Sequence, residues 1–417
     1  MKNQKSKAKS QNLDNEVKYI IIVGDGMADY PQAKLGNKTL LEAAKTPNMD
    51  FLARQGQVGL VKTIPDKVPP GSDVANLNVL GYEPAKYYTG RGPLEAASMG
   101  IKLKNNETAW RCNLVNIENG TMNDFTAGHI TNQEAKKLIT FINKNLSSDK
   151  IKFYNGVSYR HLMVSSDVPD GINCVPPHDI TGQPIEFYLP KGNGSDQIKK
   201  LMFASREFLH KHKVNIERKK TAKLEANMIW LWGQGKSISF PSLKDRFGLT
   251  GGVITAVDLI KGIGKLIGLK PLKVPGVTGF IDTAYEAKAD FAIKVLRRNN
   301  FVFVHVESPD EAGHMGDLNL KMKAIEDFDQ KLVGTILNKI GGLGKVRILL
   351  LPDHYTPISL KTHSSEPVPF VIYGHGIEPD EFEVFSEREA KKSDFIVKDG
   401  WKLIEILVGA GHTSPLH

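Results

Sequence analysis

The sequence has little cysteine and no long apolar run. Cys112 and Cys174 are the two cysteines in 417 residues, which excludes a disulfide framework, and no CxxC pair is present. So few cysteines are typical of a reducing compartment, and we expect the protein in the cytoplasm. No stretch of about 18 apolar residues occurs, so no transmembrane helix is expected. The apolar run 19–23 is too short for the core of a signal peptide, and we expect no membrane partner.

Signatures of nucleic-acid binding are also missing, although the chain is basic. The formal charge is +9 and the pI is about 9.2, values that suit a nucleic-acid binder or an enzyme with anionic substrates. The basic residues are scattered, apart from a Lys-rich head and the segment 210–220. No helix-turn-helix, zinc-finger or aromatic RNA-binding signature accompanies them. We therefore expect no nucleic-acid partner.

The chain does contain enough apolar material for two cores. With 41% hydrophobic and 24% charged residues, its composition is that of an ordinary soluble globular protein. Its length exceeds what one hydrophobic core usually fills, which predicts two domains. Residues 1–16 have the low hydrophobicity of a disordered basic head.

Both ends of the chain alternate short β-branched runs with helical spacing, which is typical of an α/β fold with a parallel sheet. Buried strands are predicted at 18–23, 301–306 and 346–351. Helices are predicted at 40–55 with a break at Pro47, and at 73–80, 321–337 and 395–408.

The middle of the chain is more polar and predicts a second domain. Strands are expected at 110–117, 162–164 and 228–231, and helices at 133–146 and 195–210. We interpret residues 85–238 as an α+β domain inserted into a discontinuous core of residues 17–84 plus 239–417. The insertion is inferred because the motifs that carry chemistry lie on both sides of it.

Metal-ligand residues follow the predicted core strands. In open α/β sheets, ligands bind at the carboxyl ends of the strands. The residues found there are Asp25 after the first strand, Asp310 and His314 after 301–306, Asp353 and His354 after 346–351, and His363 in the next loop. Each of these residues, taken alone, is more simply explained as a helix cap or as a solvated side chain. Together, three Asp and three His suit Mn²⁺, Zn²⁺ or related ions, and six ligands suit two ions.

Ser72 is a candidate nucleophile. It follows Pro69-Pro70-Gly71, a constrained turn that can aim its Oγ outward, and it precedes a predicted helix whose N-terminus favours negative charge. A bound cation can activate a serine hydroxyl. The competing interpretation is that Ser72 or Asp73 merely caps the helix.

Several motifs recur in the order of a known family. They are Val23-Gly24-Asp25-Gly26, Thr46-Pro47-Asn48-Met49-Asp50, Pro70-Gly71-Ser72-Asp73, Gly81-Tyr82-Glu83-Pro84, Tyr88-Thr89-Gly90-Arg91-Gly92-Pro93, Pro309-Asp310-Glu311-Ala312-Gly313-His314, Pro352-Asp353-His354 and His363 with Pro367-Val368-Pro369. The chain from Val17 onward resembles the alkaline phosphatase superfamily. More narrowly, it resembles the archaeal-type branch of 2,3-bisphosphoglycerate-independent phosphoglycerate mutases.

The resemblance implies an alkaline-phosphatase-like parallel-sheet core, a phosphoserine intermediate on Ser72 and two divalent ions, with Mn²⁺ expected first and Mg²⁺, Co²⁺ or Zn²⁺ as alternatives. It implies no 2,3-bisphosphoglycerate cofactor and a small phosphorylated substrate. The ligand sets that it implies are Asp25, Ser72, Asp353 and His354 for one ion, and Asp310, His314 and His363 for the other. Substrate-binding candidates in the inserted domain are Arg111, Arg160, His161, His178 and Arg218, with Arg160 also expected to assist catalysis and Asp179 as a candidate acid or base.

One departure bears on the substrate. Archaeal members carry an Asp-Arg-Arg-Ala-Gly-Arg stretch, whereas this chain has Asp124-Phe125-Thr126-Ala127-Gly128-His129. An arginine fork grips carboxylate and phosphate, which Phe and Thr cannot do. The expected activity is the interconversion of 3-phosphoglycerate and 2-phosphoglycerate in glycolysis. Alternatives are a homoserine-kinase-like phosphotransferase, a phosphomonoester hydrolase and a non-catalytic RNA- or phosphate-binding protein.

Overall fold

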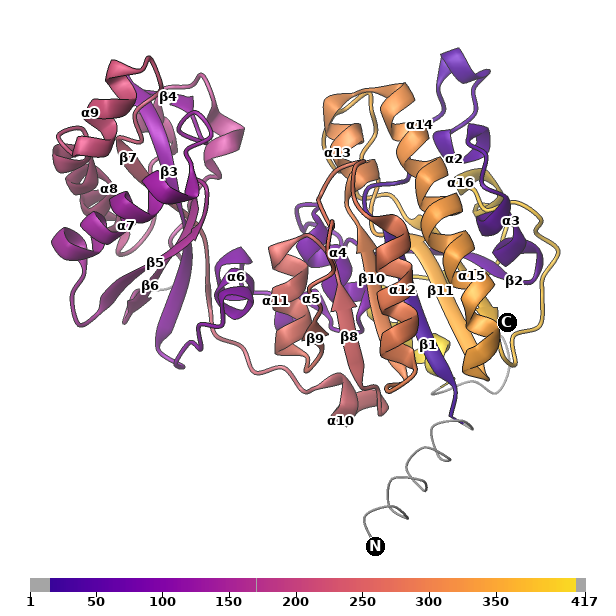
Figure 1. The fold of residues 1–417 in the computed structure, drawn as a ribbon. Coiled ribbons are helices and arrows are strands. Elements are labelled where there is room, and N and C mark those ends of the chain that lie inside the picture. Colours follow the sequence, from indigo (N-terminus) through magenta and orange to yellow (C-terminus); the bar gives the residue numbers. More distant parts are fainter. Residues whose placement is uncertain (1–15, 170, 410–417) are drawn as a thin grey trace, which may run out of the picture. The chain divides into compact units, whose positions relative to one another are not determined.

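The computed structural model describes residues 16–169 and 171–409 (Figure 1). The predicted disordered head, residues 1–16, lies outside this range except for Glu16. The described residues form two compact units: a core unit within residues 1–88 and 240–417, and an inserted unit within residues 89–239. Among the described residues, no helix combines the length and apolarity needed to cross a bilayer.

The core unit is built on an eight-stranded sheet. In sheet order, its strands are β13 (Ile396–Val397), β2 (Gly56–Val61), β12 (Val368–Gly374), β11 (Val346–Pro352), β1 (Lys18–Gly24), β10 (Phe301–Val306), β8 (Gly251–Ile254) and β9 (Lys270–Pro271). All neighbours pair in parallel except β12, which is antiparallel to both β11 and β2. The α/β fold class is therefore confirmed. The central strands are buried on both faces, as expected for continuous β-branched runs.

Helices surround this sheet. They are α2 (Leu40–Ala43), α3 (Pro47–Arg54), α4 (Ser72–Val79), α5 (Pro84–Tyr87), α10 (Leu243–Phe247), α11 (Asp258–Leu266), α12 (Tyr285–Leu296), α13 (Ser308–Met315), α14 (Leu318–Asp327), α15 (Gly334–Ile340), α16 (Glu387–Ala390) and α17 (Leu403–Val408). Short 3₁₀ segments are Ala33–Leu35, Gly341–Leu343 and Gly400–Lys402, and a π-helical segment, Phe328–Val333, joins α14 to α15. Buried side chains of α3, α12 and the π segment share one hydrophobic core with β1, β10 and β11.

One predicted helix of the core unit is confirmed and one is partly wrong. The break predicted at Pro47 is confirmed: it separates α2 from α3, because proline occupies the first turn of α3, where no N–H partner is required. The helix predicted at 395–408 was wrong over its first half. There, Ile396–Val397 pairs with β2 at the sheet edge, and the backbone carbonyls of Phe395 and Val397 accept hydrogen bonds from Leu60 and Lys62.

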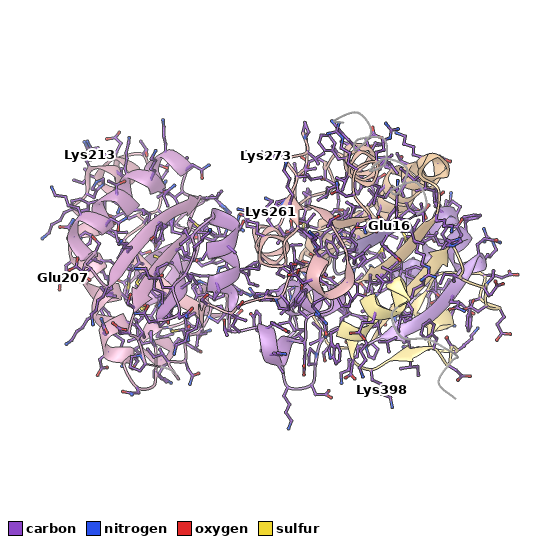
Figure 2. All side chains as sticks on the ribbon, turned by 90° about the horizontal axis from the view of Figure 1, so that it is seen from below. Glu16, Glu207, Lys213, Lys261, Lys273 and Lys398 are labelled. Atoms are coloured by element: carbon purple, nitrogen blue, oxygen red, sulfur yellow. The ribbon has the colours of Figure 1, made fainter. Side chains whose placement is uncertain are left out.

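The inserted unit has its own five-stranded sheet and its own core. Its strands are β3 (Glu107–Glu118), β4 (Thr121–Asp124), β5 (Ile151–Val157), β6 (Arg160–Ser166) and β7 (Met228–Lys236), and all pairs are antiparallel. Its helices are α6 (Arg91–Met99), α7 (Asn132–Leu146), α8 (Ser195–Leu209) and α9 (Lys213–Lys220), with 3₁₀ segments Pro177–Ile180 and Ile185–Tyr188. Exposed charges of both signs, such as Glu207 and Lys213, point outward from this unit (Figure 2).

Candidate metal centre

The sheet order brings three ligand-bearing segments together. Strand β1 lies between β10 and β11, and Gly24 is in register with Val306 on one side and Pro352 on the other. The residues that follow these strands therefore emerge at one edge of the sheet. Asp25 follows β1, Asp353 follows β11, and Asp310 lies in the first turn of α13, which begins just after β10.

The first cluster surrounds Asp25 and Asp353, two carboxylates that are almost fully buried. Asp353 Oδ1 accepts hydrogen bonds from the backbone N–H groups of Gly26 and His354, each at 3.0 Å. Asn76 Nδ2 donates to Asp353 Oδ2 at 2.6 Å. These neutral donors fix the orientation of the Asp353 carboxylate.

Ser72 lies beside this cluster rather than capping its helix. It is the first residue of α4, Gly71 occupies the N-cap position, and no side-chain cap is formed there. Its Oγ is 3.3 Å from Asp25 Oδ1 and 3.1 Å from His354 Nε2. The capping interpretation is thus not supported, and Ser72 Oγ faces the predicted ligands.

The second cluster contains Asp310, His314 and His363. The i,i+4 spacing on α13 places His314 Nε2 3.2 Å from Asp310 Oδ2, and His363 Nε2 is 3.5 Å from Asp310 Oδ1. The two imidazole Nε2 atoms are 3.0 Å apart. His354 lies close to both clusters, because its Nε2 is 3.3 Å from Asp25 Oδ1 and its ring centroid is 4.3 Å from that of His363.

The pKa values in the two clusters diverge. Burial, reinforced by the charges of Asp353 and Asp310, holds the pKa of Asp25 well above its usual range. Burial also opposes ionisation of Asp310, but hydrogen bonds from His314 and His363 hold its pKa well below the usual range. Burial acts against the charged form of His314 too, yet its pairing with Asp310 raises its pKa to about 9. Crowded carboxylates of this kind favour a bound cation.

The donor set fits two divalent ions. Two groups have ligand atoms that all lie within 4.8 Å of one another: Asp25, His305 and Asp353, and Asp310, His354 and His363. Mixed carboxylate and imidazole donors suit Mn²⁺, Co²⁺ or Zn²⁺. The structure thus brings all the predicted metal ligands together, and His305, which was not predicted from the sequence, lies beside Asp25. Its position inside the apolar run 301–306 resembles that of an ordinary core residue.

The inserted unit holds a cluster of arginines around Trp232. The guanidinium of Arg111 lies 4.3 Å from the Trp232 ring and that of Arg91 lies 5.9 Å from it. Arg111 is buried and pairs with Glu95 at 2.9 Å. Burial lowers the pKa of Arg111; the Glu95 carboxylate opposes this, and the charges of Arg91 and Arg160 add to it. Arg111 and Arg160 were predicted from the sequence as substrate-binding residues, whereas Arg91, in the motif Gly90-Arg91-Gly92, was not.

The remaining candidates of the inserted unit differ in exposure. His178 is exposed, 5.2 Å from the Trp232 ring, and its Nε2 lies 3.5 Å from Asp179 Oδ1. His161 is buried, and burial lowers its pKa to about 3. Arg218 is buried, and its three nitrogens donate to Leu224 O, Glu134 Oε2 and Ala127 O. These contacts favour a structural role for Arg218.

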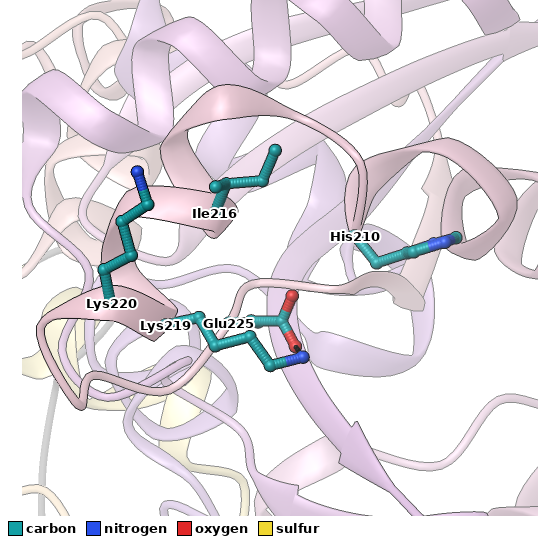
Figure 3. A pocket seen from close by; sticks show the side chains of 5 residues that line it. All are labelled: His210, Ile216, Lys219, Lys220 and Glu225. Carbon is teal, nitrogen blue, oxygen red and sulfur yellow. Dashed lines mark ion pairs between the residues drawn. The ribbon is translucent and has the colours of Figure 1, made fainter.

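A surface hollow of the inserted unit is separate from this arginine cluster. Figure 3 shows the side chains that line it, which are His210, Ile216, Lys219, Lys220 and Glu225. Lys219 pairs with Glu225 at 3.5 Å. The hollow shares no residue with the arginine cluster or the metal clusters.

Comparisons with known proteins identify relatives over most of the chain. The sequence model of a family described as 2,3-bisphosphoglycerate-independent phosphoglycerate mutase matches residues 53–215. A protein of that name from Methanosarcina barkeri is 50% identical over 397 residues, which cover 94% of this chain and 100% of that protein. A protein from Geobacter sulfurreducens, named as a probable enzyme of the same kind, is 49% identical over 397 residues with the same coverage.

Solved structures are similar over nearly the whole chain. A protein from Pyrococcus horikoshii matches with a TM-score of 0.80 and 28% identity, covering 96% of this chain and 100% of that one. A cofactor-independent phosphoglycerate mutase from Thermoplasma acidophilum matches with a TM-score of 0.64 and 26% identity, covering 94% and 99%. On the strength of these relatives, the chain belongs to the family of 2,3-bisphosphoglycerate-independent phosphoglycerate mutases.

Proposed function

We propose that the protein interconverts 3-phosphoglycerate and 2-phosphoglycerate without 2,3-bisphosphoglycerate, through a phosphoserine formed on Ser72. The observation that carries this proposal is the position of Ser72 Oγ, 3.3 Å from Asp25 and 3.1 Å from His354, among two groups of metal-ligand atoms. Relatives named as mutases, about half identical over almost the entire chain, give the substrate class.

In the first step, Ser72 Oγ forms a bond to phosphorus while the bond between phosphorus and the 3-oxygen of the substrate breaks. The serine loses a proton, and the released glycerate oxygen gains one. The 2-oxygen of the same glycerate then takes the phosphoryl group and restores the serine hydroxyl. Two divalent ions, when bound by Asp25, Asp353, His354, Asp310, His314 and His363, neutralise charge on the transferring group. Mn²⁺ is the expected metal.

Residues of the core unit and residues of the inserted unit have different proposed roles. The helix α4 N-terminus and Asn76, which donates to Ser72 O at 2.8 Å, hold the nucleophile in place. In the inserted unit, Arg111, Arg160 and Arg91 supply the positive charge for the carboxylate and phosphate of the substrate. Phe125 and Thr126 supply no such charge: Thr126 Oγ1 donates a hydrogen bond to Asp124, and Phe125 packs on Tyr159. His178 and Asp179 are proposed to lie near the substrate, with Asp179 as acid or base.

We also expect the protein to work in the cytoplasm. Its two cysteines are unpaired, and burial raises the pKa of both thiols, which makes them poorly reactive. Unpaired cysteines suit a reducing compartment.

A product assay separates the mutase from its rivals. The purified protein is incubated with 3-phosphoglycerate, Mn²⁺ and no bisphosphoglycerate, and the products are followed by phosphorus NMR. The expected result is 2-phosphoglycerate with almost no inorganic phosphate. Release of inorganic phosphate alone would indicate a phosphohydrolase instead. No conversion of 3-phosphoglycerate, together with phosphorylation of homoserine from a phosphate donor, would indicate the kinase-like alternative.

A further inference from the structure

His305 lies within β10, between β1 and β8, and its side chain is completely buried. Its Nε2 atom is 3.2 Å from Asp25 Oδ2 and 4.0 Å from Asp353 Oδ2. Among the described residues, this Nε2 has no partner with hydrogen-bond geometry. A buried nitrogen without such a partner, facing two carboxylates, requires an explanation because buried polar groups are nearly always satisfied.

The other side of the imidazole is held in place. Its Nδ1 lies 3.3 Å from Thr255 Oγ1, which also accepts a hydrogen bond from Val257 N at 3.0 Å. Lys288 Nζ donates to the backbone carbonyl of His305 at 3.0 Å. Histidines that bind metals commonly donate their second N–H to such an oxygen, which leaves the lone pair of the first nitrogen for the metal. Donation from Nδ1–H to Thr255 produces this tautomer.

We propose that Nε2 of His305 is a further ligand of the divalent ion held by Asp25 and Asp353, with Thr255 as its positioning residue. A lone pair facing carboxylate oxygens in a low-dielectric interior is repulsive, and a cation between them turns the repulsion into attraction. The imidazole nitrogen also shifts the preference of this site away from Mg²⁺ toward Mn²⁺, Co²⁺ or Zn²⁺. The proposal rests on the metal dependence of the proposed function.

The test is metal binding, measured without substrate. Metal-free wild type and His305→Leu are titrated with Co²⁺ in the presence of a competing chelator, and the visible absorption spectrum is recorded. We expect His305→Leu to bind one of the two ions at least about tenfold more weakly and to change its spectrum. The control is His210→Leu, which removes an exposed histidine that lines the surface hollow of the inserted unit and belongs to neither metal cluster; it should bind both ions as wild type does.

Wild-type affinity and spectrum in His305→Leu would overturn the proposal while leaving the mutase function intact. If the wild type itself does not bind Co²⁺, the metal dependence of the proposed function is contradicted, and the proposal for His305 with it. Circular dichroism of the metal-free variants checks folding. If His305→Leu does not fold, the same Co²⁺ titration is made with Thr255→Val. This variant keeps the imidazole of His305 but removes its hydrogen-bond partner. Weaker binding of one ion, again by about tenfold, supports the proposal, and unchanged binding of both ions contradicts it.

Discussion

At the scale of single residues, the core unit tolerates a buried carboxylate outside the metal centre. Glu387 in α16 accepts hydrogen bonds from the backbone N–H of Asp29 at 3.0 Å and from Thr39 Oγ1 at 2.6 Å. Burial raises its pKa to about 7, and these hydrogen bonds only partly offset that effect. The carboxylate therefore joins two loops of the core unit, but its charged form is costly.

This cost predicts a pH dependence of stability. Below the unfolded-state pKa of about 4.3, Glu387 is protonated in both states and has no effect. As the pH rises toward 7, the unfolded chain loses its proton first, so the free energy of unfolding should fall, by at most about 4 kcal/mol. Glu387→Gln should flatten this part of the profile, measured by urea unfolding of the metal-free protein from about pH 4.5 to 8.

The control for this prediction lies on the same helix. Glu389 is more exposed and pairs with Lys392 at 2.6 Å, so Glu389→Gln should keep the wild-type profile. Parallel profiles for wild type and Glu387→Gln would show that Glu387 does not carry the pH dependence.

At the scale of secondary-structure elements, the turn after β1 brings the two metal clusters together. Gly26 has φ +58° and donates its N–H to Asp353 Oδ1 at 3.0 Å. A Cβ at this position would meet both Asp310 Oδ1 and Thr356 Oγ1 far inside van der Waals contact. The turn therefore requires glycine for two reasons, the left-handed backbone and the close approach of α13.

A pair of glycine variants separates these reasons. Gly36 has φ +66°, and a Cβ added there would have no atom within 4 Å, so Gly36→Ala should cost about 1–2 kcal/mol of stability and leave metal affinity unchanged. Gly26→Ala has the same backbone cost but also displaces Asp310, so Mn²⁺ affinity should fall about tenfold or more. Calorimetric titration measures both. Equal metal affinity in the two variants would contradict the role of Gly26.

Much of this element-level arrangement could be predicted from the sequence. Buried β-branched runs identify β1, β10 and β11, and the Asp and His residues after them identify the ligands, because strand ends in a parallel sheet share an edge. His305 could not be found this way, since it lies inside the buried run 301–306, where an ordinary core residue is expected. Likewise, no pattern distinguishes Arg218, whose guanidinium is used within the inserted unit, from the exposed Arg160.

Across the molecule, we propose that the core unit performs the phosphoryl chemistry and that the inserted unit selects the substrate. Arg160→Ala should therefore lower 2-phosphoglycerate formation by about ten- to a hundredfold, the effect of losing one charged contact. The same variant should keep the wild-type rate of the slow release of inorganic phosphate, because Ser72 and the metal ligands are unchanged. Both rates are measured side by side with 3-phosphoglycerate as substrate.

Lys219→Ala provides the matched control, since this exposed cation of the inserted unit lies in the separate surface hollow. It should leave both rates at the wild-type level. If Arg160→Ala lowers mutase turnover and phosphate release to the same extent, the proposal that the inserted unit acts only in substrate selection is wrong.

Phosphoryl transfer through Ser72 can be observed by mass spectrometry of the enzyme quenched in acid during turnover of 3-phosphoglycerate. We expect a phosphoryl group on the peptide that contains Ser72 and on no other peptide. Ser72→Ala should carry no phosphoryl group and lose at least about 10³-fold in turnover, whereas Ser242→Ala, which removes a true N-cap serine of α10, should behave as wild type. A Ser72→Ala enzyme that still forms 2-phosphoglycerate at the wild-type rate would contradict the account.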